Sequence, residues 1–110
     1  MDINYAIGIL EDNNQAINHS FLDYLHERGQ FNEQAFWEYH DCLVTFSKKK
    51  ESMHKKDIVN KIIHTHTYVL MSFIYHFNKN DQYQIENIPE EYYTYLDKIN
   101  DAFKSCFRED

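Results

Sequence analysis

Glycine and proline are scarce in this chain, which has two glycines and one proline among 110 residues. Sandwiches, barrels and other folds of many short strands need turn residues roughly every 8–12 positions. The phosphate-binding loops of P-loop and dinucleotide-binding enzymes are likewise built from closely spaced glycines. The sequence therefore argues against an all-β fold and against these nucleotide-binding enzymes, and it favours an all-α fold.

The length of the chain fits a single helical domain, residues 1–110, around one hydrophobic core. Its composition, 43% hydrophobic and 26% charged, is that of a globular protein. The N-terminus lacks a secretory signal, no apolar run approaches the roughly 20 residues of a membrane span, and the two cysteines form no CxxC motif. We therefore expect a cytoplasmic protein with reduced cysteines and no membrane partner.

Apolar residues recur at helical spacing through most of the chain. The periodicity predicts four main helices, at residues 2–28, at 33–51, at 53–78 and from 89 onward. Such helices favour a compact antiparallel bundle, with a fifth helix if the first segment breaks near residues 12–14. The third segment is apolar nearly all round, so we expect it at the centre of the bundle. Residues 78–88 are expected to form a loop without an evident pairing partner.

Several residues are placed to begin or end these helices. Asp2 and Asn32 are predicted N-caps of the first two segments. Gly29 is placed to terminate the first segment. Pro89 fits the first position of the fourth helix, because the N–H that proline lacks has no helical partner there.

The net charge of −7 is unevenly distributed along the sequence. Residues 1–47 hold eight acids and one base, residues 48–79 hold seven lysines and two acids, and residues 80–110 hold eight acids and three bases. An acidic surface repels phosphates and attracts basic proteins. The charge pattern thus favours a basic protein partner over direct nucleic-acid binding, although a solvated surface with internally paired charges explains it equally well.

Three residues at helical spacing raise the question of a metal site. His19, Asp23 and His26 stand at positions i, i+4 and i+7, on the predicted outer face of the first segment. A single straight helix rarely completes a tetrahedral site. We therefore expect neither metal nor cofactor, while leaving these three residues open as ligands.

The cysteines and histidines do not assemble a recognisable catalytic motif. Cys42 is predicted on the polar flank of the second helix, where His40 or His66 is a conceivable partner. His66 lies in the apolar stripe of the third segment and is expected to be a hydrogen-bonded core residue. We assign no catalytic residue and expect a protein that is not an enzyme.

Aromatic residues make up 16% of the chain, more than a bundle of this size can bury. Tyrosine and tryptophan are favoured at binding hot spots, and several here are close in sequence to carboxylates. A partner-binding face of aromatic and acidic side chains is therefore expected. Its predicted members are Glu33, Trp37, Asp41, Glu90, Glu91, Tyr93 and Asp97.

Two short runs, residues 77–83 (FNKNDQY) and 88–93 (IPEEYY), accompany this acidic, tyrosine-rich and glycine-poor character. In this overall character the chain resembles the immunity proteins of bacterial toxin systems, particularly those of contact-dependent growth inhibition. The resemblance implies a cytoplasmic protein that binds one cognate toxin, often a nuclease, and blocks its active site. A ribonuclease is slightly preferred as the target, with the immunity protein as a monomer in the complex.

A different class of function remains open. The third segment carries a second stripe of large side chains behind its main apolar face. In this alternative interpretation, the chain is a small helical adaptor or regulatory protein that acts by homodimerisation through the second stripe. The stripe consists of His64, Tyr68, Met71 and Tyr75.

Overall fold

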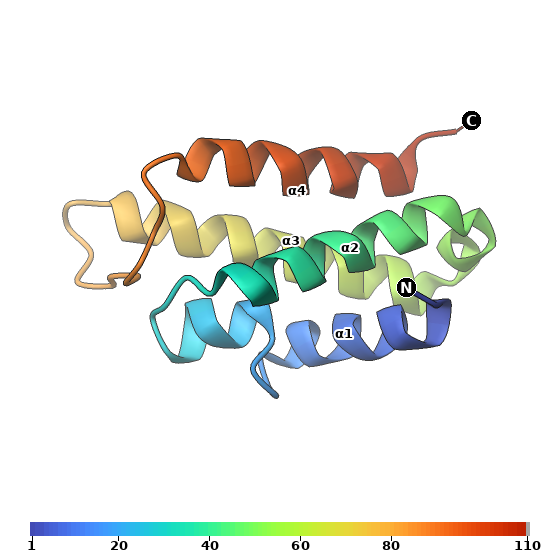
Figure 1. Cartoon of the computed structure of the whole chain (residues 1–110), viewed down its shortest axis with the longest axis horizontal. Helices are drawn as coiled ribbons and strands as arrows, with labels where there is room; N and C mark the ends of the chain where they lie inside the picture. Colours follow the sequence, from blue (N-terminus) through green and yellow to red (C-terminus); the bar gives the residue numbers. More distant parts are fainter. Residues whose placement is uncertain (110) are drawn as a thin grey trace.

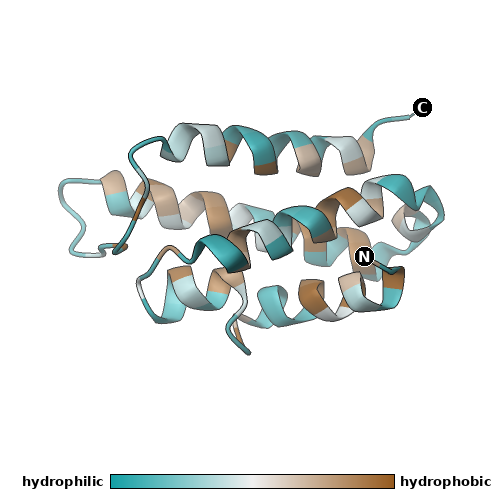
Figure 2. Ribbon diagram, viewed as in Figure 1, coloured by the Kyte–Doolittle hydropathy of each residue, from teal (hydrophilic) through white to brown (hydrophobic). Residues whose placement is uncertain are grey.

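The computed structural model describes residues 1–109 and contains four main helices joined by short helical turns and loops. The elements are α1 (Ile3–Gln15), the π-helical turn η1 (Asp23–Glu27), α2 (Glu33–Lys48), the 3-10 turn η2 (Lys50–His54), α3 (Lys56–Phe77) and α4 (Tyr92–Phe107). Successive main helices run in opposite directions (Figure 1). Hydrophobic and hydrophilic residues alternate along all four, as expected of amphipathic helices (Figure 2). The predicted all-α bundle is confirmed.

The first predicted segment is broken, so η1 forms the additional helical piece. The break lies at residues 16–20, slightly later than predicted, where Ala16, Asn18 and His19 have positive φ angles of 54°, 59° and 60°. Asn13, which is buried, joins the two sides of the break. Its Nδ2 donates to the Ile9 carbonyl oxygen at 3.0 Å, and its Oδ1 accepts from the Leu22 N–H at 3.0 Å.

Because of this break, two residues within and after it have the opposite burial from that in a continuous helix. Ile17, which a continuous helix would place on its apolar stripe, is exposed. Asp23, expected on the outer face, is buried, and its Oδ2 accepts from the backbone N–H of His19 at 2.9 Å. The carboxylate therefore stabilises the turn between α1 and η1.

The helix at the centre of the bundle is α2, and the prediction that the third segment occupies this place is wrong. α2 packs closely against both α1 and α4. Its Phe36, Tyr39 and Leu43 side chains are almost fully buried. α3 buries only one face, because its outer side has no neighbouring helix, and Tyr68 and Tyr75 remain exposed there.

The loop before α4 has a pairing partner, contrary to the prediction. The Glu86 N–H donates to the Gly29 carbonyl oxygen at 2.7 Å, and the Phe31 N–H donates to the Glu86 carbonyl oxygen at 2.8 Å. Because the loop is held there, α4 begins only at Tyr92, whose N–H donates to the Pro89 carbonyl oxygen. Pro89 thus precedes the helix by three residues, and its prediction as the first helical residue is wrong.

The predicted N-caps are confirmed. Asp2 Oδ1 accepts from the backbone N–H of Asn4 at 2.7 Å and of Tyr5 at 3.1 Å. Asn32 Oδ1 accepts from the Ala35 N–H at 2.9 Å. Both side chains satisfy N–H groups that have no partner within the helix.

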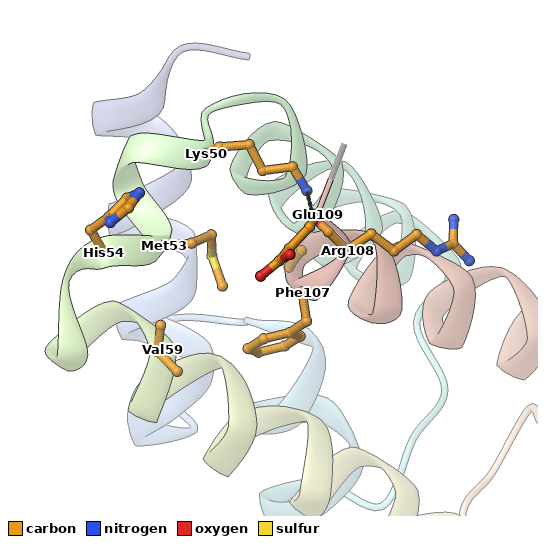
Figure 3. Close-up of a pocket in the computed structure, with 8 residues that line it drawn as sticks. Lys50, Met53, His54, Val59, Phe107, Arg108 and Glu109 are labelled. Carbon is orange, nitrogen blue, oxygen red and sulfur yellow. Dashed lines mark hydrogen bonds between the residues drawn. The ribbon is translucent and has the colours of Figure 1, made fainter.

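At the other end of the bundle, Lys50 of η2 binds the C-terminal end of α4. Its Nζ donates to the carbonyl oxygens of Ser105 at 2.7 Å and of Arg108 at 2.9 Å, beside a hollow of about 500 Å³ (Figure 3). The last carbonyl groups of a helix lack helical donors and carry partial negative charge. Lys50 therefore serves as a cap from outside α4.

The two glycines are expected to respond oppositely to substitution by alanine. Gly29 has φ +62°, and an added Cβ would lie 3.0 Å from the Gln84 carbonyl oxygen, so Gly29→Ala should lower the free energy of unfolding by about 1–2 kcal/mol. Gly8 lies within α1, and an added Cβ there meets nothing within 4 Å. Gly8→Ala should raise the free energy of unfolding by about 0.5–1 kcal/mol. Urea unfolding measures both, and shifts in the same direction would contradict these assignments.

Candidate protein-binding site

Three of the predicted partner-binding residues lie in one row on α2. Glu33, Trp37 and Asp41 are spaced at i, i+4 and i+8, which places them on one side of the helix. The two carboxylates are exposed and the indole is half-buried. Asp41 Oδ1 lies 3.0 Å from Nδ1 of the neighbouring His40. This row forms the α2 side of the candidate site.

The α2 row meets α4 through hydrogen bonds to a single carboxylate. Tyr95 donates its hydroxyl proton to Glu33 Oε1 at 2.9 Å, and Trp37 Nε1 donates to the same oxygen at 3.4 Å. The centroids of the two aromatic rings lie 6.0 Å apart. Glu33 thus holds two large aromatic side chains in fixed positions at the surface.

Two further charged residues of the α4 region complete this group. Glu91 and Lys98 line a hollow of about 260 Å³ together with Trp37 and Tyr95. Lys98 Nζ lies 5.9 Å from the centroid of the Trp37 ring, within range of a cation–π interaction. We call Glu33, Trp37, Glu91, Tyr95 and Lys98 the α2–α4 cluster. It has two carboxylates and one ammonium group around two aromatic rings.

The Tyr95 hydroxyl retains its proton in this environment. Its hydrogen bond to Glu33 raises the pKa of Tyr95, and desolvation and the negative charges of Glu33 and Glu91 raise it further. The hydroxyl therefore acts as a donor to Glu33 rather than as a base.

The remaining predicted site residues do not join the cluster. Tyr93 lies two residues from Tyr95 and therefore about 200° around the helix, where it is 60% exposed. Asp97 lies one helical turn beyond Tyr93 on the same outer side of α4. Glu90 lies in the turn before the helix. The predicted residues consequently belong to two surfaces on different sides of α4.

Sequence reasoning missed Tyr95 and Lys98. Residues 91, 95 and 98 are spaced at i, i+4 and i+7, which is a signal that they share one face of a helix. The signal could not be tied to Glu33, because 62 residues separate Glu33 from Tyr95 in the sequence. Only the close packing of α2 against α4 brings them together.

Neither cysteine is placed as a nucleophile. Cys42 is fully buried, so its prediction on the polar flank of α2 is wrong, and its Sγ donates to the Ala6 carbonyl oxygen at 3.2 Å. Burial raises the pKa of this thiol well above its usual value. Burial also raises the pKa of Cys106 to about 11, and its Sγ donates to the Leu43 carbonyl oxygen at 3.3 Å. Both thiols are therefore protonated packing groups at neutral pH.

His66 is the hydrogen-bonded core residue that the sequence predicts. Tyr39 donates its hydroxyl proton to His66 Nδ1 at 3.0 Å, and His66 Nε2 lies 3.3 Å from Asn100 Oδ1. The imidazole also stacks on Phe103, with 4.1 Å between ring centroids. Burial lowers the pKa of His66 and raises that of Tyr39, so the phenol is the donor and the imidazole is neutral.

The neutral state of His66 predicts a pH-dependent stability. Because folding depresses the pKa of His66, the unfolded chain binds a proton near pH 6.5 that the folded chain binds only at lower pH. The free energy of unfolding should therefore fall as the pH is lowered below about 6.5. Urea unfolding between pH 7.5 and 5.5 measures this fall, which should be smaller in a His66→Gln variant. Equal falls in both proteins would contradict this role of His66.

The three candidate metal ligands are not arranged around a common point. The Asp23 carboxylate accepts from His19 N–H through Oδ2, and its Oδ1 lies 3.5 Å from Arg28 Nε. His26 is exposed on η1. Across residues 1–109 the structure contains no group of three or more histidine, cysteine, aspartate or glutamate side chains suited to hold a metal.

The alternative dimerisation stripe is on the outer side of α3. His64, Tyr68 and Tyr75 are exposed, and Met71 is half-buried. Tyr68, Met71 and Tyr75 line a hollow of about 320 Å³ with residues of η1 and the loop before α4. The stripe is therefore available to a partner.

Among the described helices, none is both long enough and apolar enough to cross a membrane. Comparison of the chain with protein-family models, with curated proteins and with solved structures finds no match.

Proposed function

We propose that this protein is an immunity protein that binds a basic toxin domain and blocks its active site, with a ribonuclease as the slightly preferred target. The observation that carries the proposal is the α2–α4 cluster, in which Glu33 fixes Trp37 and Tyr95 at the surface. Aromatic side chains that are already fixed lose little entropy on binding and are favoured as binding hot spots. Glu33 and Glu91 add the negative charge that a basic partner requires.

The distribution of charge along the bundle supports the same proposal. α2 and α4 both begin at the end of the bundle that carries the loop of residues 78–91, at the left of Figure 1. That loop has four acidic residues and one lysine, whereas residues 48–56 at the opposite end have five lysines and one glutamate. A nuclease must present positive charge to bind phosphates, so an acidic end with aromatic anchors is suited to occupy its cleft.

The experiment is a titration against the basic toxin domain that this proposal expects an adjacent gene to encode. The proposal predicts a dissociation constant below micromolar, an association rate that falls as salt is added, and loss of toxin activity at one equivalent. Binding weaker than micromolar would contradict it.

Charge reversal at two positions on different sides of α4 tests the location of the site. Glu91→Lys should slow association several-fold and flatten its salt dependence, because the charge that steers a basic partner is reversed within the cluster. Asp97→Lys makes the same change of charge on the outer side of α4 and should have a smaller effect. Stopped-flow association kinetics measure both, and equal rates for Glu91→Lys and wild type would move the site elsewhere.

The second candidate function is a small adaptor that homodimerises through the outer stripe of α3. The observation that favours it is the exposure of Tyr68 and Tyr75 on that side. A homodimer dissolved by Tyr68→Glu, together with no binding to the toxin domain, would favour the adaptor over the immunity protein.

A further inference from the structure

The side of the bundle between α3 and α4 is open. The backbones of these two helices approach closely at few points, unlike those of α2 and α4. Hollows of about 500, 380 and 610 Å³ follow one another along this seam. We call this surface the α3–α4 groove and define it by Ile63, Ile74, Phe77, Tyr92, Phe103 and Phe107.

Large apolar side chains are exposed along the groove. Ile74 is 58% exposed and Phe77 is 49% exposed at one end, and Ile63 and Phe107 are also exposed at the other. Phe107 extends into the hollow at its end of the groove together with Val59 of α3 (Figure 3). Exposed apolar side chains that gather in the hollows of one groove on a small protein mark an interaction site.

The two ends of the groove carry opposite charge. Glu90 and Glu91 directly precede Tyr92, and Asp97 follows Leu96, at the end that contains Phe77. At the other end Lys104, Arg108 and Lys50 line the hollows together with one acidic residue, Glu109, so this end carries a net positive charge. A uniformly basic partner would be attracted to one end and repelled by the other. A second copy turned by 180° brings each acidic end to a basic end.

We propose that two copies of this chain pair antiparallel through their α3–α4 grooves. Ile63 and Ile74 are 11 residues apart, or about 16 Å along the helix. In an antiparallel pair related by a two-fold axis, Ile63 of one copy then lies opposite Ile74 of the other, and Ile74 of the first lies opposite Ile63 of the second. The molecule is 42 Å long, which is sufficient for an interface of roughly 800 Å² per copy. The α2–α4 cluster is on the side of α4 that faces α2, so each copy can still bind a toxin domain.

Sedimentation of the purified protein at increasing concentration tests the pairing. Wild type should sediment as a dimer at protein concentrations of roughly 10–100 µM. Ile74→Glu should sediment as a monomer, because it buries a charge in the groove. Tyr68→Glu on the outer stripe of the same helix is the matched control and should remain dimeric. A monomeric wild type, or a dimer lost with Tyr68→Glu and retained with Ile74→Glu, would overturn the proposal.

A charge-swap experiment tests the antiparallel arrangement. One variant carries Glu90→Lys and Asp97→Lys, and the other carries Lys104→Glu and Arg108→Glu. Each variant alone should be mainly monomeric, because like charges meet at both ends, and an equimolar mixture should regain the dimer. Dimers formed by each variant alone, or a mixture that stays monomeric, would overturn the arrangement. Circular dichroism verifies that each variant is folded, and no toxin enters the experiment, so its outcome is separate from that of the proposed function.

Discussion

Phe36→Ala is expected to lower the free energy of unfolding by about 3–5 kcal/mol, the largest loss among the substitutions considered. The Phe36 side chain is 1% exposed at the centre of the aromatic core. Its ring contacts Phe21 and Tyr95 edge to face, with centroids 5.4 and 4.9 Å away. Removal of the ring therefore leaves a cavity bordered by the rings of Phe21, which precedes η1, and of Tyr95 in α4. These rigid rings cannot move together to fill the cavity.

A smaller change at the same position provides the control. Phe36→Leu keeps most of the buried volume and should cost less than half as much as the alanine variant. Urea unfolding followed by circular dichroism gives both values. Since small domains are stable by only about 5–15 kcal/mol, Phe36→Ala is expected to approach the limit of folding at 37 °C. A loss below about 1 kcal/mol would contradict the central position of this residue.

Trp37→Ala is expected to weaken binding of the basic toxin domain by about 30-fold or more, equivalent to at least about 2 kcal/mol. The indole is the largest aromatic group of the α2–α4 cluster, and it contacts Glu33 and the ring of Phe36. Tyr93→Ala removes a more exposed aromatic side chain from the other side of α4. It is the matched control and should change affinity little.

Isothermal titration calorimetry of the two variants measures this difference. Because Trp37 is half-buried, thermal unfolding of Trp37→Ala must first show that the variant is folded at the titration temperature. Affinity lost with Tyr93→Ala and kept with Trp37→Ala would place the binding surface on the outer side of α4.

Local sequence signals predicted the helical parts of the fold well. Asp2 and Asn32 cap helices through their own side chains and backbone groups a few residues away. Gly29 ends the first segment with the positive φ that glycine adopts most readily. The row of Glu33, Trp37 and Asp41 follows from spacing within one helix. All of these features depend on residues that are close in sequence.

The features that sequence reasoning missed depend on distant residues. The pairing of Glu86 with residues 29–31 delays the start of α4, and no periodicity within residues 78–91 encodes that contact. Burial of Cys42 follows from the position of α1, where the Ala6 carbonyl oxygen accepts its thiol proton. The α2–α4 cluster likewise depends on the packing of α2 against α4. This packing brings the Tyr95 hydroxyl within hydrogen-bonding distance of Glu33 and leaves Tyr93 outside the cluster.

The single tryptophan of the chain offers the most direct test of a protein-binding site at the α2–α4 cluster. In a nitrogen-15 spectrum of labelled protein, Trp37 gives one indole Nε1–H signal, and unlabelled toxin domain contributes none. Addition of one equivalent of the toxin domain should shift or broaden this signal, because the partner covers the indole. An indole signal that stays unchanged while signals elsewhere in the chain shift would show that the partner binds at another surface.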